Sequence, residues 1–599
     1  MKRIVQAILF FWWLVAVAWT APPQANDEAA KLHRLFDEEW EWTLREFPEY
    51  ATNVGDNRYN DKLTDLSTEA MERRKAHERE LAKRTREIDR SRLTGQDVLS
   101  YDLFLREAEW SVSRQRFPLG KIPLFGGSVA VPLEWKPVSQ MHGIHLDIPA
   151  LPRSMPFRVA KDYDNFLARL AAYPKQIDQI IEIMKHSIAS GWMPPLAPMR
   201  RVPAQIEAQL VDDATKSPLY KTFERFPRDI DESERSRLTQ KTRAAILEAV
   251  VPALKSFNEF IKNTYLPACR QDITTSNLPG GGAYYEFLVH RFTTTQLSAQ
   301  EIHELGKREV DRIRKEMDEV ISQTGFDGAF PAFLQFLRTD PSFYFAKSQE
   351  ILPAYRDIAK RVDPELPKLF AELPRAAYGV REMPAYEGER AEYYSPGTSD
   401  STSAGYFNAY TGNVKSRPKY QMDALFLHEG VPGHHLQIAR AQELRGLPQF
   451  RRNGGYNAYG EGWALYAESL GEDLGLYRDP YSKFGQLSLE VWRACRLVVD
   501  TGIHAMGWSR EQAIDYLKER TGLSENFIVA EVDRYIAWPA QALGYKIGEL
   551  KIKELRAKAS KALGAKFDIR KFHNAVIDDG DLPLDLLEQR IDQWIESQR

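Results

Sequence analysis

Apolar residues recur every three or four positions through most of this chain, with charged residues between them. That spacing puts the apolar side chains on one face of a helix and is typical of amphipathic helices packed on a core. Ser298 followed by Glu301 forms a capping box, which predicts a helix running from there to about Ser322. The helical pattern also covers residues 27–116, 158–190, 232–265, 342–373, 421–440, 459–470, 481–506, 509–520 and 524–563. We therefore expect a mainly α-helical protein.

The main departure from this pattern is the stretch 376–413, which is rich in Tyr and Gly. Within it, residues 405–410 partly alternate between apolar and polar side chains, as a half-buried strand does. We expect a small β-sheet here. Residues 405–410 form either an edge strand that pairs with an extended peptide, with Asn408 binding the peptide backbone, or an ordinary strand of the sheet.

The length of 599 residues exceeds the roughly 250–300 at which a single hydrophobic core stops growing. We expect two helical lobes, an N-terminal one over residues 27–285 and a second over 286–599 that contains the sheet and the candidate chemistry. The run Gly280-Gly281-Gly282 interrupts the helical pattern and is a candidate for the joint between them.

The N-terminus is typical of a secretory signal peptide. Lys2 and Arg3 precede an apolar run from 4 to 17, and Ala16-Val17-Ala18 offers a cleavage site of small residues. The run is shorter than the ~20 residues of a membrane helix, although an uncleaved anchor is the alternative. A signal peptide over 1–18 predicts a periplasmic or secreted protein with no integral membrane segment once it is removed.

The charges nearly balance, with 81 basic and 84 acidic residues. Removing Lys2 and Arg3 changes the formal charge from −3 to −5, since 79 basic residues then face the same 84 acidic ones. Such a chain lacks the basic footprint of a nucleic-acid-binding protein. Two cysteines, Cys269 and Cys495, are too few for a disulfide framework or a cysteine-rich zinc site, and the sequence does not decide whether they pair.

The strongest chemical signal is the segment His428-Glu429-Gly430-Val431-Pro432-Gly433-His434-His435. In the H-E-x-x-H motif of zinc peptidases, two histidines one turn apart bind the metal, and the glutamate is the general base for a metal-activated water. Here the second histidine arrives six or seven residues after His428, which a regular helix would place out of reach. Glu429 is the expected general base.

Pro432 and Gly433 remove this difficulty. Proline cannot continue the hydrogen bonds of a helix, and glycine adopts dihedrals that other residues avoid. We therefore expect a break or bulge between the histidines. Treating Val431-Pro432 as the bulge leaves a His-Glu-Gly-Gly-His pattern, which favours His434 over His435 as the second ligand.

The third ligand is expected on a following helix. Glu461 lies 27 residues beyond His434, and Glu468 follows Glu461 by two turns on the same helix face. We expect Glu461 to bind the metal. Glu468 is expected either to orient a ligating histidine without binding the metal itself or to be a surface carboxylate. The alternative for the whole segment is a helix end capped by Pro-Gly, with the histidines near its C-terminal dipole.

The segments His428–Gln437, Gly460–Glu468, Arg496–His504 and Pro539–Gly548, with the region from Gly282 to Glu319, resemble the bacterial domain-of-unknown-function 885 family. The resemblance extends over most of the chain. That family resembles the gluzincin zinc peptidases: thimet-type oligopeptidases, the carboxypeptidase Taq family and dipeptidyl peptidase III. It implies Zn²⁺ as cofactor and a helical fold with a deep cleft between two halves. The first two groups carry a second glutamate seven residues after the ligand glutamate, which favours Glu461 as ligand. The histidine spacing departs from theirs by two residues.

Further polar residues are candidates for the reaction. His504 and Tyr545 are candidate donors to the oxyanion that develops during hydrolysis, and the resembling peptidases use a downstream tyrosine. Asp500 lies one turn before His504 and is placed to orient it, and Gln541 lies one turn before Tyr545. The alternative for these residues is a buried, satisfied hydrogen-bond cluster. Arg534 either meets a C-terminal carboxylate or forms an ion pair on a helix surface.

The function expected from these features is a zinc metallopeptidase that hydrolyses oligopeptides. One alternative is a zinc amidase acting on a non-peptide amide. The other is a catalytically silent peptide-binding protein on the same scaffold, which should lack the base or a ligand.

Overall fold

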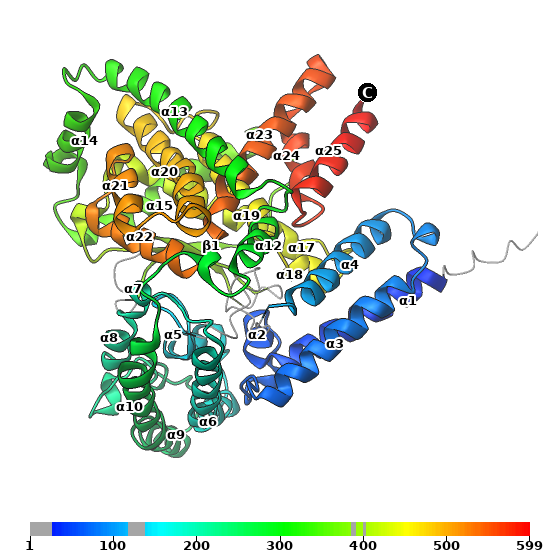
Figure 1. Ribbon diagram of the computed structural model, residues 1–599, viewed down its shortest axis with the longest axis vertical. Helices are drawn as coiled ribbons and strands as arrows, with labels where there is room; N and C mark the ends of the chain where they lie inside the picture. The colour runs from blue at the N-terminus through cyan, green and yellow to red at the C-terminus, as the bar shows by residue number, and fades with distance from the viewer. Residues whose placement is uncertain (1–26, 118–137, 385–390, 399–402) are drawn as a thin grey trace, which may run out of the picture.

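The computed structural model describes residues 27–117, 138–384, 391–398 and 403–599. It is mainly helical with one small sheet, as the apolar spacing predicts. In Figure 1 the N-terminal helices, blue to teal, make up the lower part of the molecule, and the helices coloured green to red make up the upper part. The expected signal peptide over 1–18 lies outside the described residues.

The lower part consists of two groups of helices with separate apolar cores. The first core is centred on Leu32, Phe36 and Phe104, and the second is built from side chains between Leu66 and Cys269. The first group comprises α1 (Asp27–Glu46), α2 (Pro48–Asn53), α3 (Thr68–Arg86) and α4 (Gln96–Arg114). The second comprises α5 (Ile144–Ala150), α6 (Ala160–Ser190), α7 (Leu196–Met199), α8 (Val202–Glu207), α9 (Glu232–Ala244), α10 (Val251–Phe260) and α11 (Leu266–Ala268).

The upper part is organised around α20 (Pro480–Met506), in which every residue from Phe484 to His504 is buried. α13 (Ala299–Gln323) packs along it and begins at the predicted capping box of Ser298 and Glu301. The other helices are α12 (Gly281–Thr293), α14 (Phe330–Thr339), α15 (Ile351–Val362), α16 (Met422–Glu429), α17 (His434–Glu443), α18 (Gln449–Asn453), α19 (Asn457–Ser469), α21 (Arg510–Arg520), α22 (Glu525–Ala537), α23 (Gly544–Leu563), α24 (Ile569–Ile577) and α25 (Leu584–Gln598).

The sheet has three strands, β1 (Tyr378–Glu382), β2 (Tyr393–Ser395) and β3 (Gly405–Ala409), in the order β1-β3-β2. β3 pairs in parallel with β1 and antiparallel with β2. Of the two alternatives for 405–410, the edge strand is wrong and the ordinary strand of the sheet is confirmed, because β3 is central. Asn408 is fully buried and occupied: its Oδ1 accepts from Arg381 at 2.7 Å, and its Nδ2 donates to Ser395 Oγ at 2.9 Å. Its amide holds the sheet together and is not available to a peptide.

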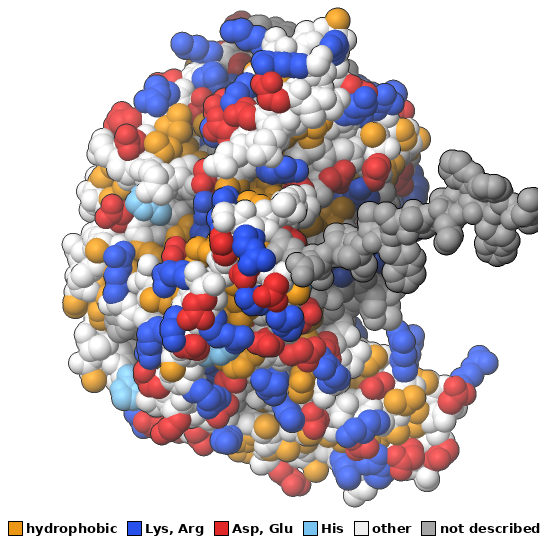
Figure 2. Space-filling model, turned by 90° about the vertical axis from the view of Figure 1, so that its right-hand side faces the viewer, with side chains coloured by type: hydrophobic (Ala, Val, Ile, Leu, Met, Phe, Trp, Pro, Cys, Tyr) orange, Lys and Arg blue, Asp and Glu red, His pale blue; other side chains and the backbone are white. Residues whose placement is uncertain are grey.

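The stretch 524–563 is not one helix. It divides into α22 and α23 around Pro539, and Ala540 adopts a positive φ of 66° at the turn. Cys269 and Cys495, both within the described part of the chain, lie in different apolar cores and form no disulfide. No helix of the described residues has the length and apolarity to span a membrane. Figure 2 shows basic and acidic side chains interspersed over the face it presents, in keeping with the near balance of charge.

Candidate metal centre

The predicted break at Pro432 separates α16 from α17. α16 ends at Glu429 and α17 begins at His434. A Cβ on Gly433 would lie 2.0 Å from the carbonyl oxygen of His428, so the turn requires glycine at this position. His428 and His434 consequently face each other from two helix ends, with ring centroids 5.0 Å apart.

Glu461 is supplied by α19, which touches α23 backbone to backbone. A Cβ on Gly548 would lie 1.7 Å from the carbonyl oxygen of Ala458, and a Cβ on Gly462 would lie 2.4 Å from Cα of Gly548. The indole of Trp463 donates to the carbonyl of Pro432 at 2.8 Å. Glycines and one tryptophan thus fix α19 against both α23 and the turn between α16 and α17.

Three potential ligand atoms meet at this point. Glu461 Oε2 lies 3.2 Å from His434 Nε2 and 3.6 Å from His428 Nε2. Ligands at ~2.0–2.1 Å from a tetrahedral zinc ion are about 3.3 Å from one another. The two separations from Glu461 fit that value, and a tetrahedral ion held by three protein ligands would have its fourth position free for water or substrate. No second cluster of three such ligands occurs within the described ranges.

The other ring nitrogen of His428, Nδ1, faces a buried carboxylate. Nδ1 lies 2.8 Å from Oε1 of Glu468, which is fully buried, and Arg493 Nη2 lies 3.3 Å from the same oxygen. A carboxylate at Nδ1 fixes the tautomer that leaves Nε2 free for a metal. Burial alone would lower the pKa of His428, but Glu461, Glu468 and Glu429 together raise it to about 9. The surrounding carboxylates therefore stabilise positive charge here.

Glu429 is oriented by the sheet. Its Oε2 accepts the backbone N–H of Tyr394 on β2 at 2.7 Å, and its Oε1 lies 4.0 Å from His428 Nε2. The pKa of Glu429 is raised above its ordinary value, because the effect of burial exceeds the opposing effect of His428 and His434. The carboxylate is thus beside the ligand cluster without belonging to it, which is where a general base is required.

The structure distinguishes the two candidate second histidines. Nδ1 of His435 lies 2.8 Å from the hydroxyl of Tyr394, and Nε2 lies 3.2 Å from the carbonyl oxygen of Ala376. Burial lowers the pKa of His435 to about 4, so its ring is neutral at neutral pH. Nε2–H then donates to the carbonyl and Nδ1 accepts from the hydroxyl. His435 joins α17 to the sheet region, and His434 is the histidine that reaches Glu461.

Tyr545 lies beside His428 with nearly parallel rings, whose centroids are 6.2 Å apart. Its hydroxyl accepts from Arg534 Nη2 at 3.1 Å and from Gln541 Nε2 at 3.4 Å. Two incoming donors leave its own proton to be donated elsewhere, and within the described part of the chain it donates to no acceptor. Burial raises the pKa of Tyr545, so the phenol keeps that proton at neutral pH.

Arg534 does form an ion pair, but not the expected one on a helix surface. Its Nη1 lies 3.3 Å from Oε2 of Glu531, which also accepts from Arg496 Nη2 at 2.9 Å. The Arg534 side chain is 16% exposed and that of Arg496 is 2% exposed. The Arg496 guanidinium lies over the ring of Tyr545, 4.3 Å from its centroid. Tyr545 is therefore bracketed by two guanidinium groups that share one carboxylate.

Comparison with known proteins bears on the whole chain. The family described as bacterial proteins of unknown function, DUF885, matches residues 48–591. The chain belongs to the DUF885 family. A crystal structure from Colwellia psychrerythraea, described as a "putative lipoprotein", is 27% identical with a TM-score of 0.89, over 95% of this chain and 99% of that one. A "putative lipoprotein of unknown function" from Shewanella oneidensis is 17% identical with a TM-score of 0.67, over 94% and 99%, which shows the shared fold. No curated protein matches.

Two of the predicted residues have other partners in this DUF885 chain. His504 Nε2 lies 2.9 Å from the carbonyl oxygen of Tyr535, and Nδ1 lies 2.9 Å from the hydroxyl of Thr275. Asp500 accepts from the Tyr285 hydroxyl at 2.6 Å and from the N–H of Ala540 at 3.0 Å. Burial raises the pKa of Asp500 to about 7. Both residues are fully buried in α20 and bind its neighbours, so neither joins the metal cluster.

Arg493 and Tyr394 contact the site but carry no local sequence signal. Tyr394 acts through its backbone N–H, which every residue except proline offers. Arg493 lies in a long helix rich in apolar residues, where a buried cation needs a partner. That requirement alone could have drawn attention to it, although it does not say which carboxylate is the partner.

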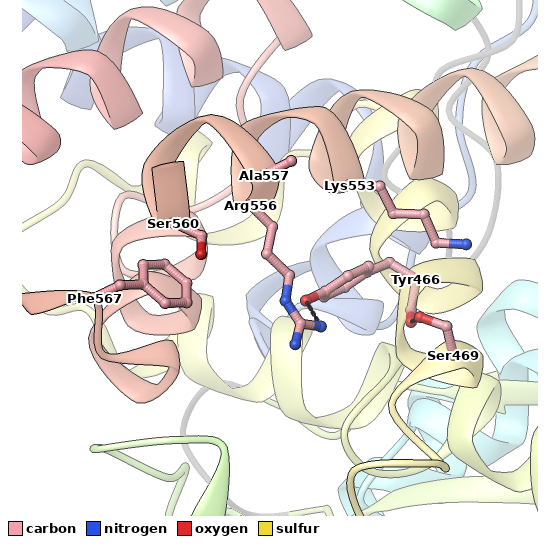
Figure 3. Close-up of a pocket in the computed structure, with 7 residues that line it drawn as sticks. All are labelled: Tyr466, Ser469, Lys553, Arg556, Ala557, Ser560 and Phe567. Carbon is pink, nitrogen blue, oxygen red and sulfur yellow. Dashed lines mark hydrogen bonds between the residues drawn. The ribbon is translucent and has the colours of Figure 1, made fainter. Parts of the chain in front are cut away.

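A pocket of about 330 Å³ lies elsewhere in this DUF885 fold, between the end of α19 and one face of α23 (Figure 3). Arg556 points into it and donates to the hydroxyl of Tyr466 at 3.0 Å. The lining comprises Tyr466, Ser469, Lys553, Arg556, Ala557, Ser560 and Phe567. It contains neither a carboxylate nor a histidine, so it is distinct from the candidate metal centre.

Proposed function

We propose that this protein is a zinc-dependent peptidase that hydrolyses oligopeptides in the periplasm or outside the cell. The observation that carries the proposal is the set of separations, 3.2 and 3.6 Å, between Glu461 Oε2 and the two histidine Nε2 atoms. A zinc ion held there by His428, His434 and Glu461 would act as a Lewis acid and lower the pKa of water.

The chain's own residues supply the remaining parts of hydrolysis. Glu429 takes a proton from the attacking water and later delivers it to the leaving amine, guided by the N–H of Tyr394 at 2.7 Å. Tyr545 donates its unused hydroxyl proton to the oxyanion that forms on the scissile carbonyl. Glu468 and Arg493 hold the His428 ring in the orientation that presents Nε2.

The N-terminal sequence supports an extracytoplasmic location, because Lys2, Arg3 and the apolar run after them have the pattern of an export signal. The description of the similar Colwellia psychrerythraea protein as a "putative lipoprotein" agrees with it, since lipoproteins are exported. The presence of the base and of all three ligand residues argues against a catalytically silent binding protein.

The test is metal content and hydrolysis of a mixed peptide library by the wild type, Glu429→Gln and Glu554→Gln. Glu554 is a carboxylate of α23 with a 57% exposed side chain and serves as the matched control. We expect about one zinc per chain in all three proteins, with hydrolysis lost only in Glu429→Gln. Undiminished hydrolysis by Glu429→Gln would refute the mechanism. Hydrolysis confined to non-peptide amides would replace the peptidase by an amidase.

A further inference from the structure

Two arginines of α20 and α22 share one carboxylate beside the candidate centre. Arg496 and Arg534 share the single carboxylate of Glu531, with nitrogen–oxygen distances of 2.9 and 3.3 Å. On the same helix, Asp533 also serves two arginines, Arg510 at 2.7 Å and Arg201 at 3.1 Å.

Arg201 and Arg510 are partly exposed to water, with 45% and 28% of their side chains accessible, so the buried imbalance is that of Arg496 and Arg534 against Glu531. Nη1 of Arg496 is buried and has no hydrogen-bond partner among the described residues. Two guanidinium groups that share one carboxylate leave one positive charge unmatched, and a ligand carboxylate would match it.

The two arginines lie next to the groups proposed to act on the substrate. Arg534 Nη2 is 3.1 Å from the Tyr545 hydroxyl, and the Tyr545 ring stacks beside His428. The Arg496 side chain is only 2% exposed to solvent, whereas the Arg534 side chain is 16% exposed. Arg534 is thus the guanidinium that a ligand can contact. The buried Arg496 makes the electrostatic potential around it more positive. Arg534 Nη2 also donates to Gln541 Oε1 at 2.6 Å. Nη1, which donates to Glu531, is therefore the nitrogen that can give a further charge-assisted hydrogen bond to a ligand carboxylate.

We infer that Arg534 binds the free C-terminal carboxylate of the peptide substrate, so that the enzyme removes residues from the C-terminus. The inference rests on the proposed function and names the substrate class of that site. Water adds across the C–N bond, which gives a shortened peptide with a new carboxylate and a released amino acid or short peptide with a free amine.

The spacing limits how much is released. The Tyr545 hydroxyl donates to the scissile oxygen, and Arg534 lies 3.1 Å from that hydroxyl. With a hydrogen bond of about 2.9 Å at each end and roughly 2 Å between the two guanidinium nitrogens, the scissile oxygen and a carboxylate bound at Nη1 are at most roughly 11 Å apart. An extended chain covers ~3.3–3.6 Å per residue. At most about three residues fit this interval, and a longer C-terminal segment does not.

The test compares two peptides that differ only in carrying a C-terminal carboxylate or a C-terminal amide. We expect the zinc-loaded wild type to cleave the free acid at least 30-fold faster in kcat/KM, and mass spectrometry to show loss of one to three C-terminal residues. Arg534→Met should remove the preference through a higher KM for the acid, and Arg534→Lys should restore part of it.

Arg556→Met is the matched control, because Arg556 likewise donates to a tyrosine hydroxyl at 3.0 Å but lies in the pocket of Figure 3. It should keep the wild-type preference. Binding gives a second readout that does not depend on turnover. Calorimetry on Glu429→Gln should show N-acetylphenylalanine binding at least tenfold more tightly than its amide, and Arg534→Met should abolish the difference.

Equal cleavage of acid and amide by the wild type would overturn the inference and leave the peptidase proposal standing. Cuts in the interior of long peptides would overturn it as well. Cleavage of neither peptide, nor of any member of a peptide library, would refute the proposed function itself. The comparison on the wild type needs no variant, so it remains decisive if Arg534→Met fails to fold.

Discussion

Replacing Gly548 by alanine should damage the metal centre without touching a ligand. The added Cβ would lie 1.7 Å from the carbonyl oxygen of Ala458 and 2.8 Å from Cα of Gly462. Ordinary van der Waals contacts of a Cβ lie at 3.4–4 Å. Both obstacles are main-chain atoms, so no side-chain rotation relieves the clash, and α19 must move away from α23 by roughly 1.5 Å.

That movement carries Glu461 with it. Metal–ligand distances tolerate only about ±0.2 Å, so a shift of this size opens the cluster in which Glu461 Oε2 now lies 3.2 and 3.6 Å from the histidine nitrogens. Overpacking of this kind costs about 1–3 kcal/mol. If this free-energy cost falls entirely on metal binding, zinc affinity decreases roughly five- to 150-fold, at 1.4 kcal/mol per factor of ten.

The assay is competition for zinc against a chromophoric chelator, with thermal unfolding measured in parallel. Gly282→Ala is the control, because Gly282 is an exposed position of α12 where a Cβ meets nothing within 4 Å. It should bind zinc like the wild type and gain a little stability from better helix propensity. Wild-type zinc affinity and unchanged stability in Gly548→Ala would show that the close contact of α19 and α23 does not set the site geometry.

Three further results are expected. Arg493→Met should weaken zinc binding roughly 10–100-fold, less so in Arg493→Lys, and equal affinities in a chelator competition would contradict the role given to its contact with Glu468. Tyr545→Phe should lower kcat by about 10²–10³ with little change in KM, and an unaltered kcat would exclude it as oxyanion donor. Asp500 has a pKa of about 7 in the folded protein against ~3.9 unfolded, so the native state binds more protons and stability falls as pH rises from about 4 to 7. Urea unfolding of Asp500→Asn should show a smaller fall than the wild type, and identical slopes would refute this.

Features with a local cause could be predicted from the sequence. The capping box of Ser298 and Glu301 begins α13 because both partners lie within one helical turn. The break between α16 and α17 follows from the missing N–H of Pro432 and the freedom of Gly433. The choice of His434 over His435 followed from that break, and the contacts of both rings agree with it.

Features set by distant parts of the chain could not be predicted. Whether β3 lies at an edge depends on β2, which lies earlier in the chain and has only three residues. Asp500 and His504 are one turn apart, yet Asp500 pairs with Tyr285 and His504 with Thr275, each more than 200 residues away. Helical spacing indicates which face a side chain occupies but not which segment packs on that face.

The most direct test of the central claim is an anomalous difference map collected at the zinc absorption edge from crystals of the zinc-loaded protein. A single strong peak about 2.0–2.1 Å from His428 Nε2, His434 Nε2 and a carboxylate oxygen of Glu461 is the predicted result. No peak between these three residues, or a peak bound instead by His435, would contradict it.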